Sequence, residues 1–315
     1  MTANGDTTTH QHAIIGPQEN QWLYSSKTGF DLSRSADKAA GKTVTLKTST
    51  TPITLDPAKS ALVIIDMQNF FLSEAFGRKK DGSGHAALKR LVEVAVPAAR
   101  KAGIRVVWLN WGLTDDEVRS MPPAVTRAFG FEVMSGEKGE GEAASKQGAT
   151  LDLAENAEGR YYKGLGSECG LVRDPATGQE IDAGRLLVRG AWNSALYPPL
   201  DKMYEEGRLL EQRSDVWIHK NRMSGMWGAK SECEEFLDKE GIRTLLFTGV
   251  NTDQCVGGTL TDSFSKGYDC ILLNDGAATS SPEFAQKCFE FNAGNTFGFA
   301  TTCEALAEGV NSMEH

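Results

Sequence analysis

The chain has 315 residues, 40% of them hydrophobic and 24% charged, which is enough apolar material for a large folded core. Its formal net charge of −9 argues against a nucleic acid or an anionic membrane as a partner, and no apolar run approaches the roughly 20 residues of a membrane span. The N-terminus is polar, unlike a signal peptide, and the six cysteines lack a Cys-x-x-Cys pair, so we expect a reducing, cytoplasmic setting.

We interpret residues 1–50 as an N-terminal extension and residues 51–315 as a single α/β domain. The extension is rich in Thr, Ser, Lys, Gln and Gly, a composition typical of a disordered leader. Apolar residues such as Trp22, Val44 and Leu46 favour instead an arm with a short hairpin, docked on the domain or on a neighbouring subunit.

A β-α-β unit opens the domain. Residues 61–66 form an apolar run that ends on Asp66, which predicts the first core strand. Apolar residues recur at helical spacing over 88–99, and Gly103 is placed to end that helix. Residues 104–109 then predict a second strand.

Residues 112–184 show the least regular pattern in the chain. They are rich in glycine, and residues 174–178 read DPATG, a turn signal. We expect a long insertion with little regular structure that covers the site or an interface.

The rest of the chain alternates between strand and helix patterns. Strands are predicted at 217–220, 244–250 and 270–273, and helices near 230–240, after Cys255, and around 282–293 and 302–309. This alternation predicts a doubly wound, mainly parallel α/β sheet with helices on both faces. Asp275 also ends a predicted strand, and we expect it to cap the following turn rather than to act in catalysis.

Three predicted strands deliver reactive side chains to their carboxyl ends. Asp66 ends one strand, Lys220 ends another, and Cys255 follows a third. The carboxyl ends of parallel strands share one edge of the sheet, and ligands bind at that edge. We therefore expect the carboxylate, the ammonium group and the thiol to lie together.

Cys255 lies at a strand-to-helix turn, where Thr252 or Asp253 is placed to cap the helix. The positive end of a helix dipole lowers a thiol pKa, so the position favours a nucleophilic thiolate. The alternative is a small buried side chain, the usual environment of an intracellular cysteine.

The segments around these residues carry a family resemblance. The runs VIIDMQN at 63–69, HKNRMSG at 219–225 and GVNTDQCV at 249–256 resemble, in order and spacing, the three signatures of the isochorismatase-like cysteine hydrolases. The resemblance covers roughly residues 55–115 and 185–300 and implies a sheet of about six strands, flavodoxin-like in arrangement.

Two further runs narrow the resemblance. VVWLNWG at 106–112 and RGAWN at 189–193 resemble the branch that contains the ureidoacrylate amidohydrolases. The family also implies a dimer or a tetramer.

The three side chains suit nucleophilic attack on a carbonyl group. A carboxylate beside a lysine stays ionised, so we expect Asp66 to act as the general base and Lys220 to lower the pKa of Cys255 and orient Asp66. The sulfur then forms a thioester. The backbone N–H of Cys255 is one oxyanion donor, and the resemblance implies that of Asn251, after a cis Val250–Asn251 bond, as the other.

We expect no metal and no cofactor. Nicotinamidases of this superfamily carry an Asp-x-His pair where this chain reads Asn110-Trp111-Gly112, and its five histidines offer no ligand cluster. Position and resemblance give six candidate substrate-binding residues, some of which belong to the core in the alternative interpretation. They are Phe70, Asn110, Trp111, Trp192, Met223 and Gln254.

The predicted function is hydrolysis of a C–N bond in a small amide, ureido or carbamoyl compound by a homodimer or homotetramer. One alternative is hydrolysis of another small ester or vinyl ether on the same fold. True isochorismatases cleave a vinyl ether but lack the cysteine, so Cys255 argues against that branch. The other alternative is a non-catalytic binding or redox-sensing protein, against which the intact Asp66, Lys220 and Cys255 argue.

Overall fold

The computed structural model describes residues 10–34, 42–134, 141–144 and 163–313. At the centre lies a six-stranded sheet in the order β12-β7-β6-β13-β14-β15, in which every neighbouring pair is parallel. In that order the strands are Val216–Lys220, Arg105–Trp111, Ser60–Ile65, Thr244–Val250, Asp269–Ala278 and Phe299–Thr301. The predicted α/β class and parallel sheet are confirmed.

The two middle strands are buried along their whole length. Every residue of β6 and of β13 is inaccessible to solvent, whereas the edge strand β12 alternates between buried and partly exposed positions. Continuous apolar runs are what a parallel strand needs when helices cover both faces of the sheet. This burial explains why the sequence of β6 and β13 shows no alternation.

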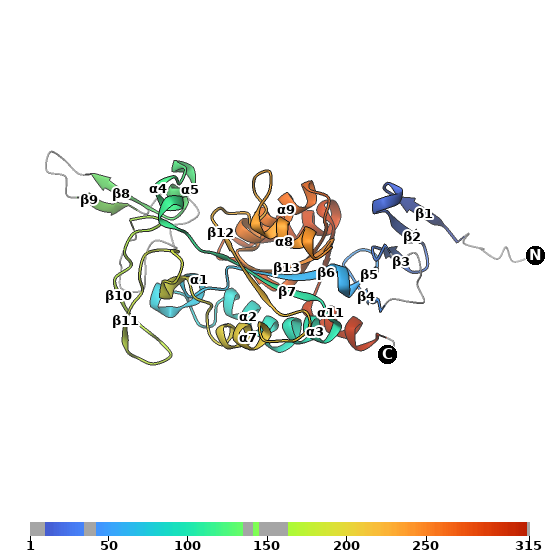
Figure 1. Ribbon diagram of the computed structural model, residues 1–315, viewed down its shortest axis with the longest axis horizontal. Helices are drawn as coiled ribbons and strands as arrows, with labels where there is room; N and C mark the ends of the chain where they lie inside the picture. The colour runs from blue at the N-terminus through green and yellow to red at the C-terminus, as the bar shows by residue number, and fades with distance from the viewer. Residues whose placement is uncertain (1–9, 35–41, 135–140, 145–162, 314–315) are drawn as a thin grey trace, which may run out of the picture.

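Helices cover both faces of the sheet (Figure 1). On one face lie α8 (Glu232–Lys239) and α9 (Gly257–Ser265), and on the other lie α2 (Ser83–Arg90), α3 (Val96–Ala102), α7 (Leu200–Gly207) and α11 (Cys303–Asn311). A short α1 (Asn69–Leu72) follows β6, and α10 (Glu283–Asn292) packs against two π-helical turns, η7 (Thr252–Val256) and η8 (Ala293–Phe297).

The helix expected over 88–99 is longer than its apolar pattern. Its two α-helical parts, α2 and α3, are joined by a π-helical turn, η4 (Leu91–Ala95), and the run ends at Gly103 with a φ of 80°. A left-handed residue at this position is the usual glycine stop of a helix.

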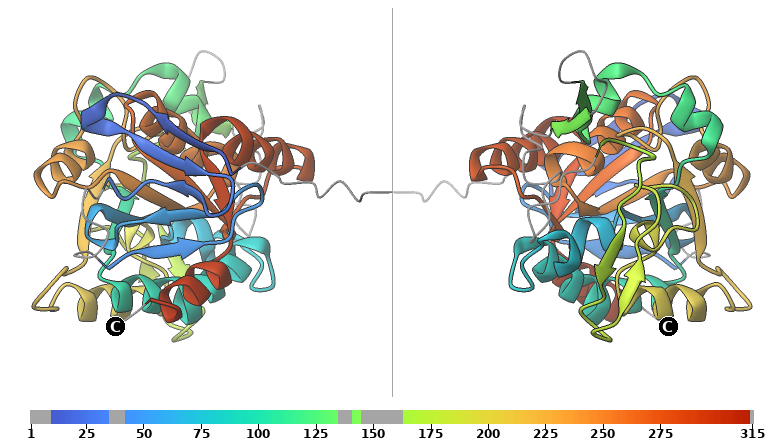
Figure 2. Two further views of the ribbon diagram at one scale, coloured as in Figure 1. Left: turned by 90° about the vertical axis from the view of Figure 1, so that its right-hand side faces the viewer. Right: turned by 90° about the vertical axis from the view of Figure 1, so that its left-hand side faces the viewer.

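The N-terminal residues form a second sheet at the end of the molecule opposite to β8–β11 (Figures 1 and 2). Its order is β1-β2-β3-β5-β4, with bounds His12–Ile15, Trp22–Ser25, Gly29–Asp31, Ile53–Leu55 and Val44–Leu46. The sheet is larger than the expected hairpin and continues to Leu55. It docks on its own chain, where the apolar side chains of β4 and β5 share a core with α11.

The segment 112–184 is more regular than expected in its described part. It holds α4 (Asp115–Arg119), α5 (Pro123–Ala128) and two hairpins, β8–β9 (Phe131–Met134, Gly141–Ala144) and β10–β11 (Leu171–Arg173, Glu180–Asp182). A capping box formed by Thr114 and Glu117 starts α4, so a start signal was present in the sequence. Residues 135–140 and 145–162 lie outside the described residues.

Asp275 has a different role from the one expected. It lies inside the ten-residue strand β14, and its carboxylate accepts hydrogen bonds from the Cys303 N–H at 2.7 Å and from Arg90 Nε at 2.8 Å. It therefore anchors the start of α11, and the predicted cap on the following turn is wrong.

Counted along the chain, the strand order of the central sheet is 3-2-1-4-5-6. This is the order of dinucleotide-binding doubly wound sheets, and it differs from the flavodoxin order 2-1-3-4-5, although both sheets are doubly wound. The direction of winding reverses between β6 and β13. At Gly249 these strands come so close that a Cβ would lie 2.0 Å from the Ile65 carbonyl oxygen, and φ is 105° there, so the position requires glycine.

Candidate active site

The three predicted reactive side chains, those of Asp66, Lys220 and Cys255, meet near the carboxyl ends of β6 and β13, where the direction of winding of the sheet reverses. Lys220 Nζ lies 2.9 Å from Asp66 Oδ2, and both side chains are at most 1% exposed. The thiol of Cys255, which follows β13, also interacts with the Asp66 carboxylate and lowers its pKa. Side chains from three strands thus form one buried network.

Lys220 reaches this point from the edge of the sheet. Its ammonium group passes 4.2 Å from the centre of the Trp111 ring on the intervening strand β7 and bonds the Arg222 and Met223 carbonyls at 3.1 and 3.2 Å. The two backbone carbonyls, the Asp66 carboxylate and the face of the Trp111 ring together hold the Lys220 ammonium group in one position.

Asp66 is held in a conformation that is rare for a residue with a side chain. Its φ is 54°, and its Oδ1 accepts the backbone N–H of Trp111 at 3.1 Å. Residues in this region of backbone space concentrate at functional sites.

Cys255 lies within the π-helical turn η7, and Asn251 is the N-cap residue of this turn. No side chain caps this turn, so the expected cap by Thr252 or Asp253 is wrong; Asp253 instead accepts the Thr279 hydroxyl at 2.6 Å. The N–H groups of Gln254 and Val256 both donate to the Asn251 carbonyl. The expected cis peptide between Val250 and Asn251 is present.

The pKa of Cys255 moves in the direction opposite to the one expected. Burial raises it to about 12, and the Lys220 ammonium opposes this rise without overcoming it. The sequence pattern placed the thiol at a helix start but did not show that the side chain is only 4% exposed. The raised pKa favours the thiol over the thiolate at Cys255.

Burial also raises the pKa of Asp66, against the lowering effect of the Lys220 ammonium and of the bonds from Cys255 and Trp111. A carboxylate with a raised pKa is a stronger base. The thiol and the carboxylate thus interact directly, an arrangement in which a proton can pass from one to the other.

Three of the candidate substrate-binding residues belong to an aromatic cluster. The ring centres of Trp111 and Phe129 lie 5.1 Å apart, those of Phe70 and Phe129 lie 6.5 Å apart, and Trp192 stacks on Phe76 at 5.9 Å. Trp111 joins this cluster to Lys220, and both Trp111 and Phe70 are fully buried within it.

The other three candidates differ in their relation to the network. The Met223 sulfur lies 3.3 Å from that of Cys255. Asn110 precedes Trp111 on β7, so its side chain leaves the opposite face of the strand, and both of its buried polar atoms lack a hydrogen-bond partner in the described structure. Gln254 bonds Asn251 and Ser281, each at 3.3 Å.

Two residues that the sequence reasoning missed support the site. Gln68 exchanges hydrogen bonds with the Trp111 backbone and also bonds the Ser194 carbonyl, so it ties two loops to β7. It stands two places after Asp66 in the first motif, which was the available signal. Phe129 lies in the segment with the weakest pattern, where no signal marked it.

Within the described ranges, no three His, Cys, Asp or Glu side chains lie close enough together to hold a metal ion. In the same part of the chain, every helix is too short or too polar to cross a membrane.

Comparison with known proteins agrees with the geometry. The model of the isochorismatase domain family matches residues 174–305, a range that contains Lys220 and Cys255 but not Asp66. The resemblance to the isochorismatase family is thereby confirmed.

Two solved structures share the fold. A cysteine hydrolase from Pseudomonas syringae pv. phaseolicola aligns with a TM-score of 0.50 and 19% identity over 82% of this chain and 95% of its own. A putative isochorismatase from Burkholderia xenovorans aligns with a TM-score of 0.50 and 16% identity over 80% of this chain and 88% of its own. The fold is therefore isochorismatase-like.

Proposed function

We propose that this protein is a cysteine-dependent amidohydrolase that cleaves a C–N bond of a small amide, ureido or carbamoyl compound. The match to the isochorismatase domain supports hydrolase activity. The observation that carries the proposal is the buried network in which Asp66 contacts both the Lys220 ammonium and the Cys255 thiol.

In the first half of the reaction, the Cys255 thiol gives its proton to Asp66 as its sulfur attacks the substrate carbonyl carbon. The C=O π electrons move to oxygen, and the resulting oxyanion accepts hydrogen bonds from the backbone N–H groups of Asn251 and Cys255. The tetrahedral species collapses, the C–N bond breaks, and protonated Asp66 delivers its proton to the departing nitrogen. A thioester on Cys255 and a free amine or ammonia result.

In the second half, Asp66 is again a carboxylate and takes a proton from water as the water oxygen attacks the thioester carbonyl. The second tetrahedral species expels the Cys255 sulfur, which recovers the proton from Asp66. The Lys220 ammonium, 2.9 Å from Asp66, balances the negative charge that moves between carboxylate, sulfur and oxyanion.

The neighbourhood of the network favours a flat substrate. The Trp111 ring and the Met223 thioether border the reacting groups, and both are weakly polar surfaces that suit a conjugated or ureido group. Ureidoacrylate-type compounds fit this description, as do carbamoyl amino acids and simple primary amides.

The experiment is an ammonia-release screen over ureido, carbamoyl and primary amide compounds, run in parallel with the Cys255→Ser protein. We expect release with at least one class and none with the variant, because a serine hydroxyl at this place has no comparably reactive anion. Release by the variant at the wild-type rate would reject the mechanism. Release from an ester or vinyl ether alone would favour the rival hydrolase activity.

Two further proposals accompany this function; they concern the cellular compartment and the oligomeric state. All six cysteines are free, which suits the reducing, cytoplasmic compartment expected from the sequence. Phe284 and Phe291 on α10 are 76% and 66% exposed, which suits a homodimer or homotetramer. Sedimentation of the purified protein distinguishes a monomer from both.

A further inference from the structure

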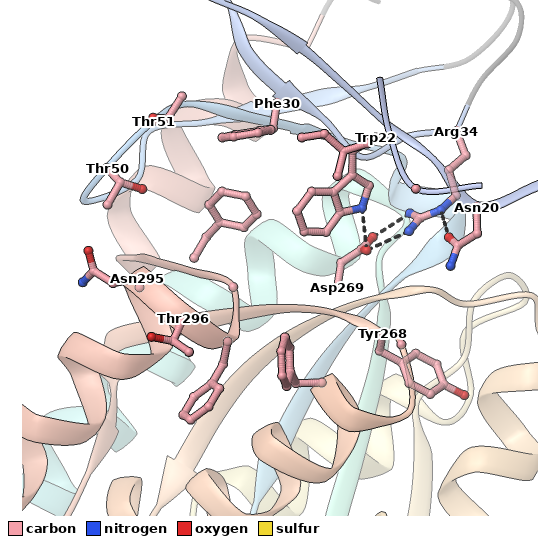
Figure 3. Close-up of a pocket in the computed structure, with 18 residues that line it drawn as sticks. Asn20, Trp22, Phe30, Arg34, Thr50, Thr51, Tyr268, Asp269, Asn295 and Thr296 are labelled. Carbon is pink, nitrogen blue, oxygen red and sulfur yellow. Dashed lines mark hydrogen bonds and ion pairs between the residues drawn. The ribbon is translucent and has the colours of Figure 1, made fainter. Parts of the chain in front are cut away.

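A large cavity lies between the N-terminal sheet and the central domain (Figure 3). It measures about 610 Å³ and is lined by residues of the N-terminal sheet, of α9 and the start of β14, and of η8. We call it the amino-end cavity, because Asp269 is the first residue of β14.

The amino-end cavity is separate from the candidate active site. Thr244, the first residue of β13, bonds Asp269, whereas Cys255 follows the other end of β13. The seven residues of β13 span roughly 20 Å at about 3.3 Å per residue. The proposed hydrolysis at Cys255 therefore does not explain this cavity.

Aromatic side chains from two parts of the chain line this cavity. They are Trp22, Phe30, Phe264, Tyr268, Phe297 and Phe299. The Phe299 ring centre lies 5.7 Å from that of Trp22 and 5.6 Å from that of Phe30, and the Phe264 and Phe297 rings pair at 5.5 Å. Phe264 is still 44% exposed, so this lining has apolar surface left to cover.

The only charged side chains among its lining residues are Arg34 and Asp269, and they are fully used by each other and by their neighbours. Arg34 donates to both Asp269 oxygens at 2.6 and 2.7 Å, and Trp22 Nε1 and Thr244 Oγ1 each donate to Asp269 at 2.8 Å. The remaining polar lining groups are neutral, such as the side chains of Thr51 and Thr296. A charged ligand would lose its hydration without meeting an unpaired counter-charge.

We propose that the amino-end cavity is a second small-molecule site, which binds an uncharged, flat aromatic or heteroaromatic compound. Its volume lies within the range of known ligand sites, which are mostly apolar with a few polar groups that orient the ligand. Aromatic rings attract a flat ligand through offset or edge-to-face contacts. The neutral hydroxyl and amide groups at the rim in Figure 3, including Thr51, Asn295 and Thr296, bond the edge of such a ligand.

Indole is the probe that tests this site, because it is flat, uncharged and carries one N–H donor. Titration calorimetry of the full chain should show saturable binding of indole, and much weaker binding of benzoate and of cyclohexanol, which test charge and flatness. Phe264→Ala should weaken indole binding roughly two- to tenfold through the loss of one ring contact. Thr51→Trp, which fills the cavity beside Phe30, should abolish it.

Phe284→Ala is the matched control, because Phe284 is an exposed phenylalanine outside the lining and its loss should leave indole affinity unchanged. Cys255→Ser should also leave it unchanged, so the outcome does not depend on the proposed hydrolysis.

The proposal is overturned if indole shows no saturable binding up to its solubility limit, or if Phe264→Ala binds it as tightly as Phe284→Ala does. It is also overturned if benzoate binds as well as indole. A Phe264→Ala protein that loses self-association, with no indole bound by the wild type, would assign the cavity to an interface between copies.

Discussion

Two buried ion pairs lie at opposite ends of the central sheet, and they differ in how their hydrogen bonds are used. Asp269, at the amino end, is 2% exposed and accepts from four donor atoms of Trp22, Arg34 and Thr244. Asp66, at the carboxyl end, accepts a hydrogen bond from the Trp111 backbone N–H. It also faces the Lys220 ammonium group and the Cys255 thiol, which carries a proton. In the first pair, which we call the clamp, every donor to the carboxylate is fixed in place. The second, which we call the reactive pair, places a carboxylate next to a thiol.

The comparison shows that burial alone does not distinguish an ion pair that stabilises the fold from one that can take part in a reaction. Both pairs are nearly inaccessible to solvent, and both join strands to segments distant in sequence. What differs is whether every lone pair of the carboxylate already has a fixed donor. A carboxylate with a mobile proton beside it can do acid–base work.

The largest effect should come from Lys220→Met at the reactive pair. The change keeps an apolar stem but removes the charge that balances the proton transfer, so we expect kcat/KM to fall on the order of 10³-fold or more. Steady-state kinetics on a substrate from the ammonia-release screen measures this, with circular dichroism as the check on folding. A folded Lys220→Met protein with near wild-type kcat/KM would remove Lys220 from the mechanism.

The matched change at the clamp is Arg34→Met. It leaves the Asp269 carboxylate buried without its cation, so the free energy of unfolding should fall by about 3 kcal/mol. Because the clamp is roughly 20 Å from Cys255, kcat/KM of the folded fraction should change less than twofold. Urea unfolding and kinetics on the same preparation test both statements, and a loss of activity with unchanged stability would reverse the assignment.

A smaller effect is expected from His219, which neighbours Lys220 on β12; the nearby charges of Arg189 and Glu117 act on its pKa in opposite directions. Its pKa is lowered to about 4, mainly by burial, and its Nδ1 lies 3.3 Å from Trp217 Nε1, an arrangement that needs the neutral ring. A folded pKa below the unfolded one means that the unfolded chain binds more protons between pH 6.5 and about 4.

Stability should therefore fall as the pH drops through that window. The full shift corresponds to about 3 kcal/mol, and solvent screening of the partly exposed ring reduces the expected loss to about 2 kcal/mol. His219→Asn, which keeps an acceptor near Nδ1 but does not titrate, should flatten this part of the stability profile. Equal slopes for the two proteins in urea unfolding between pH 4 and 6.5 would show that His219 charges freely in the folded state.

The grouping of Asp66, Lys220 and Cys255 could be anticipated from the sequence because each of these residues ends a strand or follows one. Residues 60–65 and 244–250 are apolar runs, and an edge shared by parallel strands brings Asp66 and Cys255 together without further information. The clamp could not be anticipated, since Arg34 and Asp269 are 235 residues apart, and Arg34 follows β3 of the N-terminal sheet whereas Asp269 begins β14 of the central sheet.

The raised pKa of Cys255 could not be predicted from the sequence either. The helix start at Gly257 is a local signal, but the thiol also interacts with Lys220 and Trp111 on β12 and β7 and lies 3.3 Å from the Met223 sulfur, all distant in sequence. The strand order was missed for a similar reason, because residues 216–220 carry no sign of which sheet edge they join.

The central claim, that the Cys255 sulfur becomes acylated during turnover, is tested most directly by rapid quenching followed by mass spectrometry of the peptides. With a substrate that releases ammonia, the account predicts an acyl group on the peptide that contains Cys255, and a hydroxamate product when hydroxylamine competes with water. Turnover with no adduct on Cys255 and no hydroxamate, or an adduct on another cysteine only, would contradict it.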